Sequence, residues 1–338
     1  MDLRDLEAEV LVKEWITIVL LTKNGERYLG EVLEAIFAQR VDLPFEVLAI
    51  DSGSRDRTKE ILSSYPVRFI EIPPYEFNHG ETRNLGARLA HPDTHYLVYL
   101  SQDATPADEG WLAALIEPMR EDERVAGVFS RHLPRPSASP SLVRQLLTRW
   151  QTGGTERLVK RMPLSRDDFE ANRFFYIYFS NTSSAIRRSV WEQIPFRPLL
   201  FGEDADWAER VLLAGYILVF EPRSEVFHSH DYGLLELFRE NADYAAAFQE
   251  RFCPPAYRAF GLRAVLRGMI RESWEDWRFI WRHPHFCEQP LRRRLFWMLY
   301  SPAWHLAVGL GTYCGIRGLS RRPELRHHLS RQERIRQT

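Results

Sequence analysis

The stretch Tyr96-Leu-Val-Tyr-Leu-Ser-Gln-Asp-Ala-Thr-Pro-Ala107 decides the fold class of this chain. Its first five residues are apolar and aromatic, which predicts a buried strand over 96–100. The strand stops at Ser101-Gln102-Asp103, and in open α/β sheets ligands bind in the loops just past the carboxyl ends of strands. Asp103 is therefore the first candidate for chemistry. The alternative is that it caps a helix beginning near Asp108-Glu-Gly-Trp111.

The sequence around this stretch predicts further strands. Apolar runs alternate with segments of helical spacing, as in βαβ units, and this alternation favours an α/β fold with a parallel sheet. The predicted strands are 15–21, 45–50, 67–72, 96–100, 125–129 and 216–220, and the predicted helices between the first of them are 28–37, 58–64 and 83–90. Polar turns follow these strands at 22–25, 51–56 and 101–103, and we expect the turns to share one edge.

The composition indicates a globular intracellular protein. The chain has 338 residues, 45% hydrophobic and 27% charged, which is ample for one large domain and an appendage. A formal net charge of −1 gives no overall attraction to nucleic acid, and no recognition motif for it occurs. The cysteines Cys253, Cys287 and Cys314 match no zinc spacing, so we expect buried thiols in a reducing compartment. The acidic start, Met1-Asp-Leu-Arg-Asp-Leu-Glu7, lacks a signal-peptide core, which favours a cytoplasmic protein.

The polar turns suit a nucleotide sugar, which needs polar groups for its nucleoside and positive charge for its phosphates. Asp51 directly follows a predicted strand, where an acidic residue can accept hydrogen bonds from a ribose or base. The alternative is an ordinary Asp-Ser-Gly turn that caps the next helix. The chain has no Gly-x-Gly-x-x-Gly after its first strand and no Gly-x-x-x-x-Gly-Lys-Ser/Thr, so dinucleotide and P-loop sites lack their usual residues.

A series of short motifs follows in order along residues 15 to 232. These motifs are Thr22-Lys-Asn-Gly25, Gln39, Asp51-Ser-Gly-Ser-Arg-Asp-Arg-Thr58, Phe77-Asn-His-Gly80, Thr82-Arg-Asn-Leu-Gly86, Ser101-Gln-Asp-Ala104, Arg131-His-Leu-Pro-Arg135, Phe179-Ser-Asn181, Ser184-Ala-Ile-Arg-Arg188, Glu203-Asp-Ala-Asp-Trp207 and His228-Ser-His230. Together they resemble family 2 glycosyltransferases of GT-A fold, most closely the rhamnosyltransferase-like branch. The resemblance implies a Rossmann-like, mixed but mostly parallel sheet flanked by helices, as a nucleotide-sugar-dependent catalytic domain over 1–230.

The resemblance also implies a metal site. The family's Asp-x-Asp motif corresponds here to Ser101-Gln102-Asp103, so Asp103 remains as the direct carboxylate ligand. One or two carboxylates, with substrate phosphates and waters, can hold a divalent cation such as Mg²⁺ or Mn²⁺. The resemblance adds His228 or His230, with His228 favoured, and an imidazole ligand favours Mn²⁺. The alternative is a pair of partly exposed histidines without a ligand role.

The same resemblance places the catalytic base at Asp204. Inverting transfer needs a carboxylate opposite the leaving group to take the acceptor hydroxyl's proton. Clustered acids around Asp204 would raise its pKa toward neutrality. The alternative is a first helical turn enriched in acids by the helix dipole, which describes Asp206.

Further site residues are assigned from their positions in the motifs. Arg83 would neutralise the donor diphosphate through bidentate contacts, unless it is a solvated helix residue. His79 is left undecided. The residues expected to bind the nucleotide sugar are Thr22, Asn24, Asp51, Arg83, Gln102 and Asp103. Those expected at the acceptor or sugar pocket, or else as structural hydrogen-bonders, are Arg131, Asn181 and Glu203.

From about residue 231 the chain becomes helical, basic and aromatic, and we expect a separate region over 231–338. The predicted helices are 234–251 and 256–281, and the segment 295–316 is nearly free of charge and flanked by arginines. It approaches membrane-spanning length, but Pro302 and several glycines argue against a clean span. We expect peripheral membrane contact through 292–322 as an in-plane helix or hairpin drawn to anionic lipid, at the inner face of the cell membrane. The alternative is a helical subdomain packed on the catalytic core.

The resulting expectation is an inverting, metal-dependent glycosyltransferase that moves L-rhamnose from dTDP-rhamnose to a lipid-linked or polysaccharide acceptor in cell-surface glycan synthesis. Rhamnose rests on the resemblance alone. The alternatives are a UDP-sugar donor, or an inactive membrane-associated scaffold, for which Ser101 in the metal motif is the best argument.

Two related classes of enzyme fit less well. In a processive synthase the motif Gln-x-x-Arg-Trp follows the Glu-Asp pair, whereas Gln145-Leu-Leu-Thr-Arg-Trp150 has one residue too many and precedes that pair. A nucleotidylyltransferase carries a glycine-rich, lysine-containing loop near its N-terminus, where this chain has only Lys23-Asn-Gly25.

Overall fold

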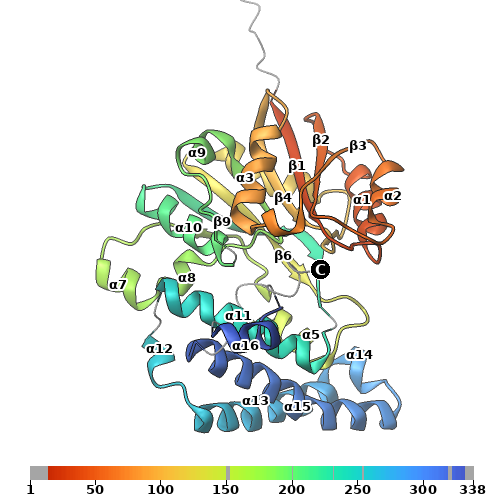
Figure 1. Cartoon of the computed structure of the whole chain (residues 1–338), viewed down its shortest axis with the longest axis vertical. Coiled ribbons are helices and arrows are strands. Elements are labelled where there is room, and N and C mark those ends of the chain that lie inside the picture. The colour runs from red at the N-terminus through yellow and green to blue at the C-terminus, as the bar shows by residue number, and fades with distance from the viewer. Residues whose placement is uncertain are drawn as a thin grey trace, which may run out of the picture.

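The computed structural model describes residues 14–149, 153–199, 201–230, 232–252, 255–318 and 322–331. The expectations that concern residues 1–13, Trp150, Cys253 and Arg321 lie outside this part of the chain. Within it, a mixed sheet flanked by helices is followed by a layer of helices (Figure 1). Cys287 and Cys314 are free thiols, but both are only partly buried, which corrects the expectation of buried thiols.

The described sheet has nine strands in the order β3-β2-β1-β4-β8-β6-β9-β5, and β7 pairs with β9. The strands are β1 (Trp15–Thr22), β2 (Phe45–Asp51), β3 (Val67–Glu71), β4 (Thr94–Ser101), β5 (Thr105–Pro106), β6 (Val125–Leu133), β7 (Leu158–Lys160), β8 (Ser183–Arg187) and β9 (Ile217–Phe227). The four neighbouring strands β3, β2, β1 and β4 are parallel to one another, and β8 is antiparallel to both of its neighbours, β4 and β6. The predicted fold class is confirmed, although the short strands β5, β7 and β8 were not predicted.

Helices cover both faces of the sheet (Figure 1). They are α1 (Leu29–Phe37), α2 (Thr58–Ser63), α3 (His79–Leu89), α4 (Trp111–Glu121), α5 (Pro140–Thr148), α7 (Arg166–Ala171), α8 (Arg173–Ile177), α9 (Arg188–Gln193) and α10 (Glu203–Leu213). On β1, Ile18 and Leu20 pack with α1 and α4, whereas Val19 packs in the cluster that includes α3, α9 and α10. Successive side chains of a strand point to opposite faces, so burial on both faces requires a continuous apolar run.

Two predicted boundaries are corrected by local chemistry. β6 and β9 run past their predicted ends because their second halves bury polar side chains, such as His132 and Ser224, which interrupt the apolar run. α3 begins at His79 and not at residue 83. The reason is that the Asn78 side chain caps the helix, accepting a hydrogen bond from the Glu81 N–H at 3.0 Å.

The C-terminal helices form a layer beside the sheet. They are α11 (Leu234–Phe252), α12 (Pro255–Arg258), α13 (Leu262–Arg282), α14 (Pro284–Cys287), α15 (Leu291–Ile316) and α16 (Pro323–Leu329). The predicted helix 256–281 is thus divided before α13, where Gly261 is extended at the N-cap. α11 lies between the sheet and the pair α13 and α15 (Figure 1), and its Phe248 and Phe252 join the core on one face of the sheet. The boundary at residue 230 stays a prediction.

The predicted membrane segment is a continuous helix packed in protein along its second half. A Cβ at Gly311 would lie 2.2 Å from the Phe238 carbonyl oxygen of α11, and one at Gly309 would lie 2.7 Å from Val265 of α13. The glycines therefore permit close helix packing. For the second half of α15, this agrees with the alternative of a packed helical subdomain. No helix in the described part of the chain is long and apolar enough to cross a bilayer.

A buried carboxylate joins α5, α13 and α15. Asp276 on α13 is fully buried and accepts hydrogen bonds from Ser141 of α5, from Ser301 at 2.6 Å and from His305 Nε2 at 2.8 Å. The Arg144 guanidinium of α5 lies 2.6 Å from its other oxygen. A buried charge with so many donors holds the helical layer to α5, which follows β6 of the sheet.

Candidate active site

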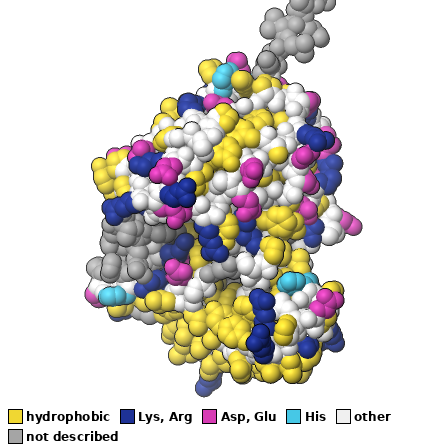
Figure 2. Space-filling model, turned by 90° about the vertical axis from the view of Figure 1, so that its right-hand side faces the viewer, with side chains coloured by type: hydrophobic (Ala, Val, Ile, Leu, Met, Phe, Trp, Pro, Cys, Tyr) yellow, Lys and Arg dark blue, Asp and Glu magenta, His cyan; other side chains and the backbone are white. Residues whose placement is uncertain are grey.

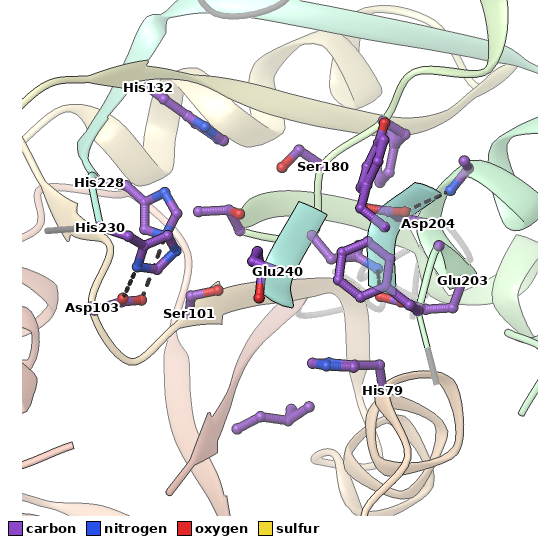
Figure 3. Close-up of a pocket in the computed structure, with 18 of the residues that line it drawn as sticks. His79, Ser101, Asp103, His132, Ser180, Glu203, Asp204, His228, His230 and Glu240 are labelled. Carbon is purple, nitrogen blue, oxygen red and sulfur yellow. Dashed lines mark hydrogen bonds and ion pairs between the residues drawn. The ribbon is translucent and has the colours of Figure 1, made fainter. Parts of the chain in front are cut away.

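A cavity of about 910 Å³ lies where the strand-end loops face α11. Its lining includes Asp103 after β4, Asp204 at the start of α10, and His228 and His230 after β9 (Figure 3). The two carboxylates that the sequence singled out therefore share one cavity.

Asp103, His228 and His230 form a cluster at one side of this cavity (Figure 3). The His230 Nδ1 lies 3.3 Å from one Asp103 oxygen and the His228 Nε2 lies 3.6 Å from the other. One ligand atom from each residue lies within 4.8 Å of the others. One carboxylate and two imidazoles are a donor set that fits a divalent cation. Both histidines therefore lie close enough to Asp103 to bind the same ion. Asp103 does not cap α4; at the start of that helix, Asp108 Oδ1 accepts a hydrogen bond from the Gly110 N–H.

Burial keeps the His228 imidazole neutral. Burial lowers the His228 pKa well below its ordinary value, and the nearby His230, His132 and Arg135 add to the effect. His132 was not singled out from the sequence, and burial together with His230 lowers its pKa to about 4. Metal binding requires the neutral form of histidine, so the environment of His228 suits a ligand.

Glu203 and Asp204 occupy the first turn of α10, opposite the histidine cluster. Glu203 is buried, lies 2.9 Å from the Arg83 guanidinium and accepts a hydrogen bond from the Asn181 side chain at 3.1 Å. Its burial would raise its pKa, but Arg83, His79 and Asn181 hold it below the ordinary value.

Asp204 has the opposite electrostatic environment. Burial, and next the charge of Glu203, raise its pKa to about 7, which outweighs the hydrogen bond from the Ala205 N–H at 2.8 Å. A carboxyl with a pKa near 7 exchanges a proton readily at neutral pH, as a general base must.

The loops after β1 and β4 are held together by Gln102. Its side chain accepts a hydrogen bond from the Lys23 N–H and donates one to the Lys23 carbonyl, both at 2.9 Å. A Cβ at Gly25 would lie 2.3 Å from the Gln102 side-chain oxygen, so glycine is required for this approach. Asn24, at a φ of 47°, accepts the Arg55 N–H. Thr22, Asn24 and Gln102 all line the cavity, as expected.

Asp51 is not among the lining residues and is fully buried. One of its oxygens accepts the N–H groups of Gly53 and Ser54, at 3.0 and 2.7 Å. The other accepts the hydroxyls of Thr22 and Ser54. Asp51 therefore organises the turn, and its neighbour Ser52 reaches the cavity. Contact of Asp51 with a ribose or base stays a prediction.

Three further residues assigned from the motifs lie in different surroundings: Asn181, Arg83 and Arg131. Asn181 lines the cavity and orients Glu203. Arg83 also lines it, and because it is buried and paired with Glu203 it is not a solvated helix residue. Its contact with the donor diphosphate stays a prediction. Arg131 is absent from the lining and pairs with Glu225 at 2.8 Å. It is adjacent to His132 on β6, and adjacent strand residues face opposite sides, so His132 takes the place expected for Arg131.

The C-terminal region supplies residues that the motifs did not indicate. Glu240 of α11 and Arg331 line the cavity and lie 3.0 Å apart. The Arg331 guanidinium lies 4.6 Å from the Tyr232 ring centre, and that ring stacks on His230 at 4.6 Å. Glu240 and Arg331 follow no strand of the sheet and lie in no family motif. Their position at the cavity therefore depends on how the C-terminal helices pack and could not be predicted from the sequence.

Comparison with known proteins accounts for this arrangement. The model of glycosyl transferase family 2 matches residues 17–182. The O-antigen chain rhamnosyltransferase WbaN of Salmonella anatum is 33% identical over 230 residues, which cover 67% of this chain and 70% of that protein. The chain belongs to glycosyltransferase family 2. A second relative, the O-antigen chain rhamnosyltransferase RfbN of Salmonella typhimurium, is 32% identical over 231 residues, 68% of this glycosyltransferase and 70% of that protein.

A solved structure confirms the fold of this glycosyltransferase. The mannosyltransferase from Pyrobaculum calidifontis, in complex with GDP-Man and Mn²⁺, aligns with a TM-score of 0.54 at 17% identity. The alignment covers 90% of this chain and 86% of the mannosyltransferase. The GT-A fold and the rhamnosyltransferase-like character predicted from the motifs are therefore both confirmed.

Proposed function

We propose that this glycosyltransferase is inverting and metal-dependent, and that it transfers L-rhamnose from dTDP-rhamnose to a lipid-linked or polysaccharide acceptor in cell-surface glycan synthesis. The observation that carries the proposal is the shared cavity of the Asp103 cluster and Asp204. The choice of rhamnose is supported by the two Salmonella relatives, which are named as rhamnosyltransferases.

Asp204 acts as the general base in this proposal. Its carboxylate takes the proton of the acceptor hydroxyl while that oxygen forms a bond to the anomeric carbon, and the bond from this carbon to the diphosphate oxygen breaks. With a pKa of about 7, Asp204 is ionised in a large fraction of molecules at neutral pH. Glu203 keeps Asp204 basic through its charge, because Arg83 and Asn181 hold Glu203 ionised.

Asp103, His228 and His230 would hold the divalent cation, Mg²⁺ or Mn²⁺. The chemistry that the cation supplies when bound is to offset the negative charge of the departing diphosphate. A cation with imidazole ligands is more often Mn²⁺ than Mg²⁺. Thr22 at the end of β1, with Asn24 and Gln102 on the loops after β1 and β4, would bind the nucleoside of the donor.

The decisive experiment incubates the purified protein with a panel of nucleotide sugars and measures release of nucleoside diphosphate with and without Mn²⁺ or Mg²⁺. We expect release from dTDP-rhamnose above all, dependent on the cation and abolished by Asp103→Ala. Glu109→Gln is a matched control, because Glu109 is an exposed carboxylate outside the cavity that pairs with Arg40. Preference for a UDP-sugar would retain glycosyl transfer and reject rhamnose. No release from any donor would favour the inactive scaffold.

We also propose that the protein acts in the cytoplasm, peripherally at the inner face of the cell membrane, where it would meet a lipid-linked acceptor. Only part of the segment 292–322, as far as the structure describes it, is exposed and free to contact lipid. Its second half packs on α11 and α13, whereas Leu295, Phe296 and Leu299 in its first half are exposed.

A further inference from the structure

Large apolar side chains lie exposed along one side of α13. Leu266, Ile270 and Trp274 recur every four residues, and Ile270 and Trp274 are 65% and 57% exposed. Leu262 and Trp281 extend this row toward the two ends of the helix. Single exposed apolar residues are ordinary, but a contiguous row marks an interaction surface.

The first turns of α15 add a second row. Leu291, Leu295 and Leu299 recur at the same spacing, with Phe296 beside them. α13 and α15 run side by side at the end of the molecule away from the sheet (Figure 1), and Arg294 of α15 lies 4.2 Å from the ring centre of Trp281 on α13. The two rows form one surface, here called the α13/α15 face: Leu262, Leu266, Ile270, Trp274, Trp281, Leu291, Leu295, Phe296 and Leu299.

Arginines border the α13/α15 face. Arg263, Arg267 and Arg282 each follow an apolar residue of the α13 row, which places them about 100° around the helix from it. Arg292 and Arg293 stand at the start of α15. These arginines are exposed, and within the described part of the chain none of them is ion-paired. Figure 2 shows basic side chains beside an apolar area at this end of the molecule.

Acidic residues do not offset this positive charge, because those of α13 are already paired. Glu272 binds Arg144 and Arg271, and Glu275 binds Arg278. Asp276 is buried among its donors. The exposed charge around the face is therefore net positive.

The charge distribution decides which partner fits. A second copy of the chain, meeting this face with its own, would bring arginines against arginines without carboxylates between them. A bilayer containing anionic phospholipid would accept the apolar rows among its acyl chains and pair the arginines with its headgroups. Tryptophan side chains such as Trp274 and Trp281 also favour the interface between lipid and water.

We propose that the α13/α15 face docks this protein on the surface of a bilayer rich in anionic phospholipid, with both helices lying in the interfacial plane. The main contact is thus α13, outside the segment 292–322 indicated by the sequence. α11 then lies between the bilayer and the sheet (Figure 1). The catalytic cavity, which residues of α11 help to line, lies between α11 and the strand-end loops. Docking on a bilayer is consistent with the proposed function, in which the acceptor is lipid-linked. Binding to lipid can nevertheless be measured without any donor or acceptor.

The test is co-sedimentation of the full chain with vesicles of phosphatidylcholine alone or mixed with phosphatidylglycerol. We expect the protein to partition onto the mixed vesicles and much less onto phosphatidylcholine. The double variant Ile270→Glu/Trp274→Glu should lower the partition coefficient at least about tenfold. Arg263→Gln/Arg267→Gln should reduce the preference for anionic vesicles and its sensitivity to salt. Leu164→Glu, at a fully exposed residue outside the face, is the control and should bind as the wild type does.

Each remaining outcome would count against the proposal. If the wild type fails to bind mixed vesicles at low ionic strength, or if Ile270→Glu/Trp274→Glu binds as well as the wild type, the face does not dock on lipid. If sedimentation velocity shows a dimer that this variant dissociates, while vesicles recruit no protein, the face joins two copies. Donor hydrolysis in the absence of vesicles should be equal in all variants, so loss of hydrolysis alone would count only against the proposed catalysis.

Discussion

Glu203 and Asp204, adjacent at the start of α10, have carboxyl pKa values shifted in opposite directions. Arg83 and Asn181 hold the Glu203 pKa below its ordinary value against the effect of burial. For Asp204, burial together with the Glu203 charge outweighs the weaker effect of Arg83 and raises the pKa to about 7. One carboxylate thus serves as a fixed charge that makes the other a base.

Asp204→Asn should abolish most of the transfer activity. Loss of a general base typically costs about 10²- to 10⁴-fold in rate, whereas donor binding at the other side of the cavity should persist. Steady-state kinetics with calorimetric measurement of nucleotide binding separates the two effects. Equal activity of variant and wild type would remove Asp204 from the mechanism.

The transfer rate should rise with pH through about 7 and level off above it, because Asp204 is active only when deprotonated. Glu203→Gln removes a neighbouring negative charge, which lowers the Asp204 pKa. The midpoint of the profile should therefore move down by roughly one pH unit. The profile of kcat against pH is the measurement, and an unchanged midpoint would show that Glu203 does not tune the base.

Asp204→Asn should also stabilise the protein at high pH. The folded-state pKa of Asp204 lies above its ordinary value, so its contribution to stability is greatest at low pH and is lost as pH rises through about 7. The loss begins near the ordinary pKa of 3.8 and is complete above about 7, so removing the carboxylate should raise the free energy of unfolding by about 2 kcal/mol more at pH 8 than at pH 5. Urea denaturation at the two pH values measures the difference, and an equal effect at both would contradict the raised pKa.

Cation binding should depend on both histidines. His228→Gln and His230→Gln should each weaken Mn²⁺ binding by about 10- to 100-fold, since each removes one of the three ligand groups. Mn²⁺ affinity is measured by electron paramagnetic resonance, and a chelator should abolish donor hydrolysis by the wild type. If only one variant weakens binding, the other histidine is not a ligand.

Asp276→Ala should destabilise the protein by about 3 kcal/mol, because it leaves the Arg144, Ser141, Ser301 and His305 donors without their buried acceptor. Glu275→Gln is the control: Glu275 makes an exposed ion pair with Arg278, and its loss should cost less than about 0.5 kcal/mol. Urea denaturation of both variants gives the comparison. Equal effects would show that the buried cluster contributes no more than a surface pair.

The fold could be predicted largely because its central strands are buried on both faces. That burial demands continuous apolar runs, as in β1 and β4, and such runs are visible in the sequence. β8, which lies between β4 and β6 in the sheet, has only Ala185 and Ile186 as apolar residues, so its composition does not predict a strand. The candidate ligands Asp103, His228 and His230 were found because they lie in short motifs.

The sequence by itself determined where β1, β2 and β4 end and which polar groups stand beside those ends, since these are properties of neighbouring residues. The ends of β6 and β9 needed the structure. Only the tertiary structure decided which charges meet: Arg83 pairs with Glu203, Arg131 with Glu225, and Arg331 with Glu240. It also turned Asp51 inward to organise its loop. The physical reason is that such pairings depend on the order of strands and the packing of helices from distant parts of the chain, which no local pattern of residues encodes.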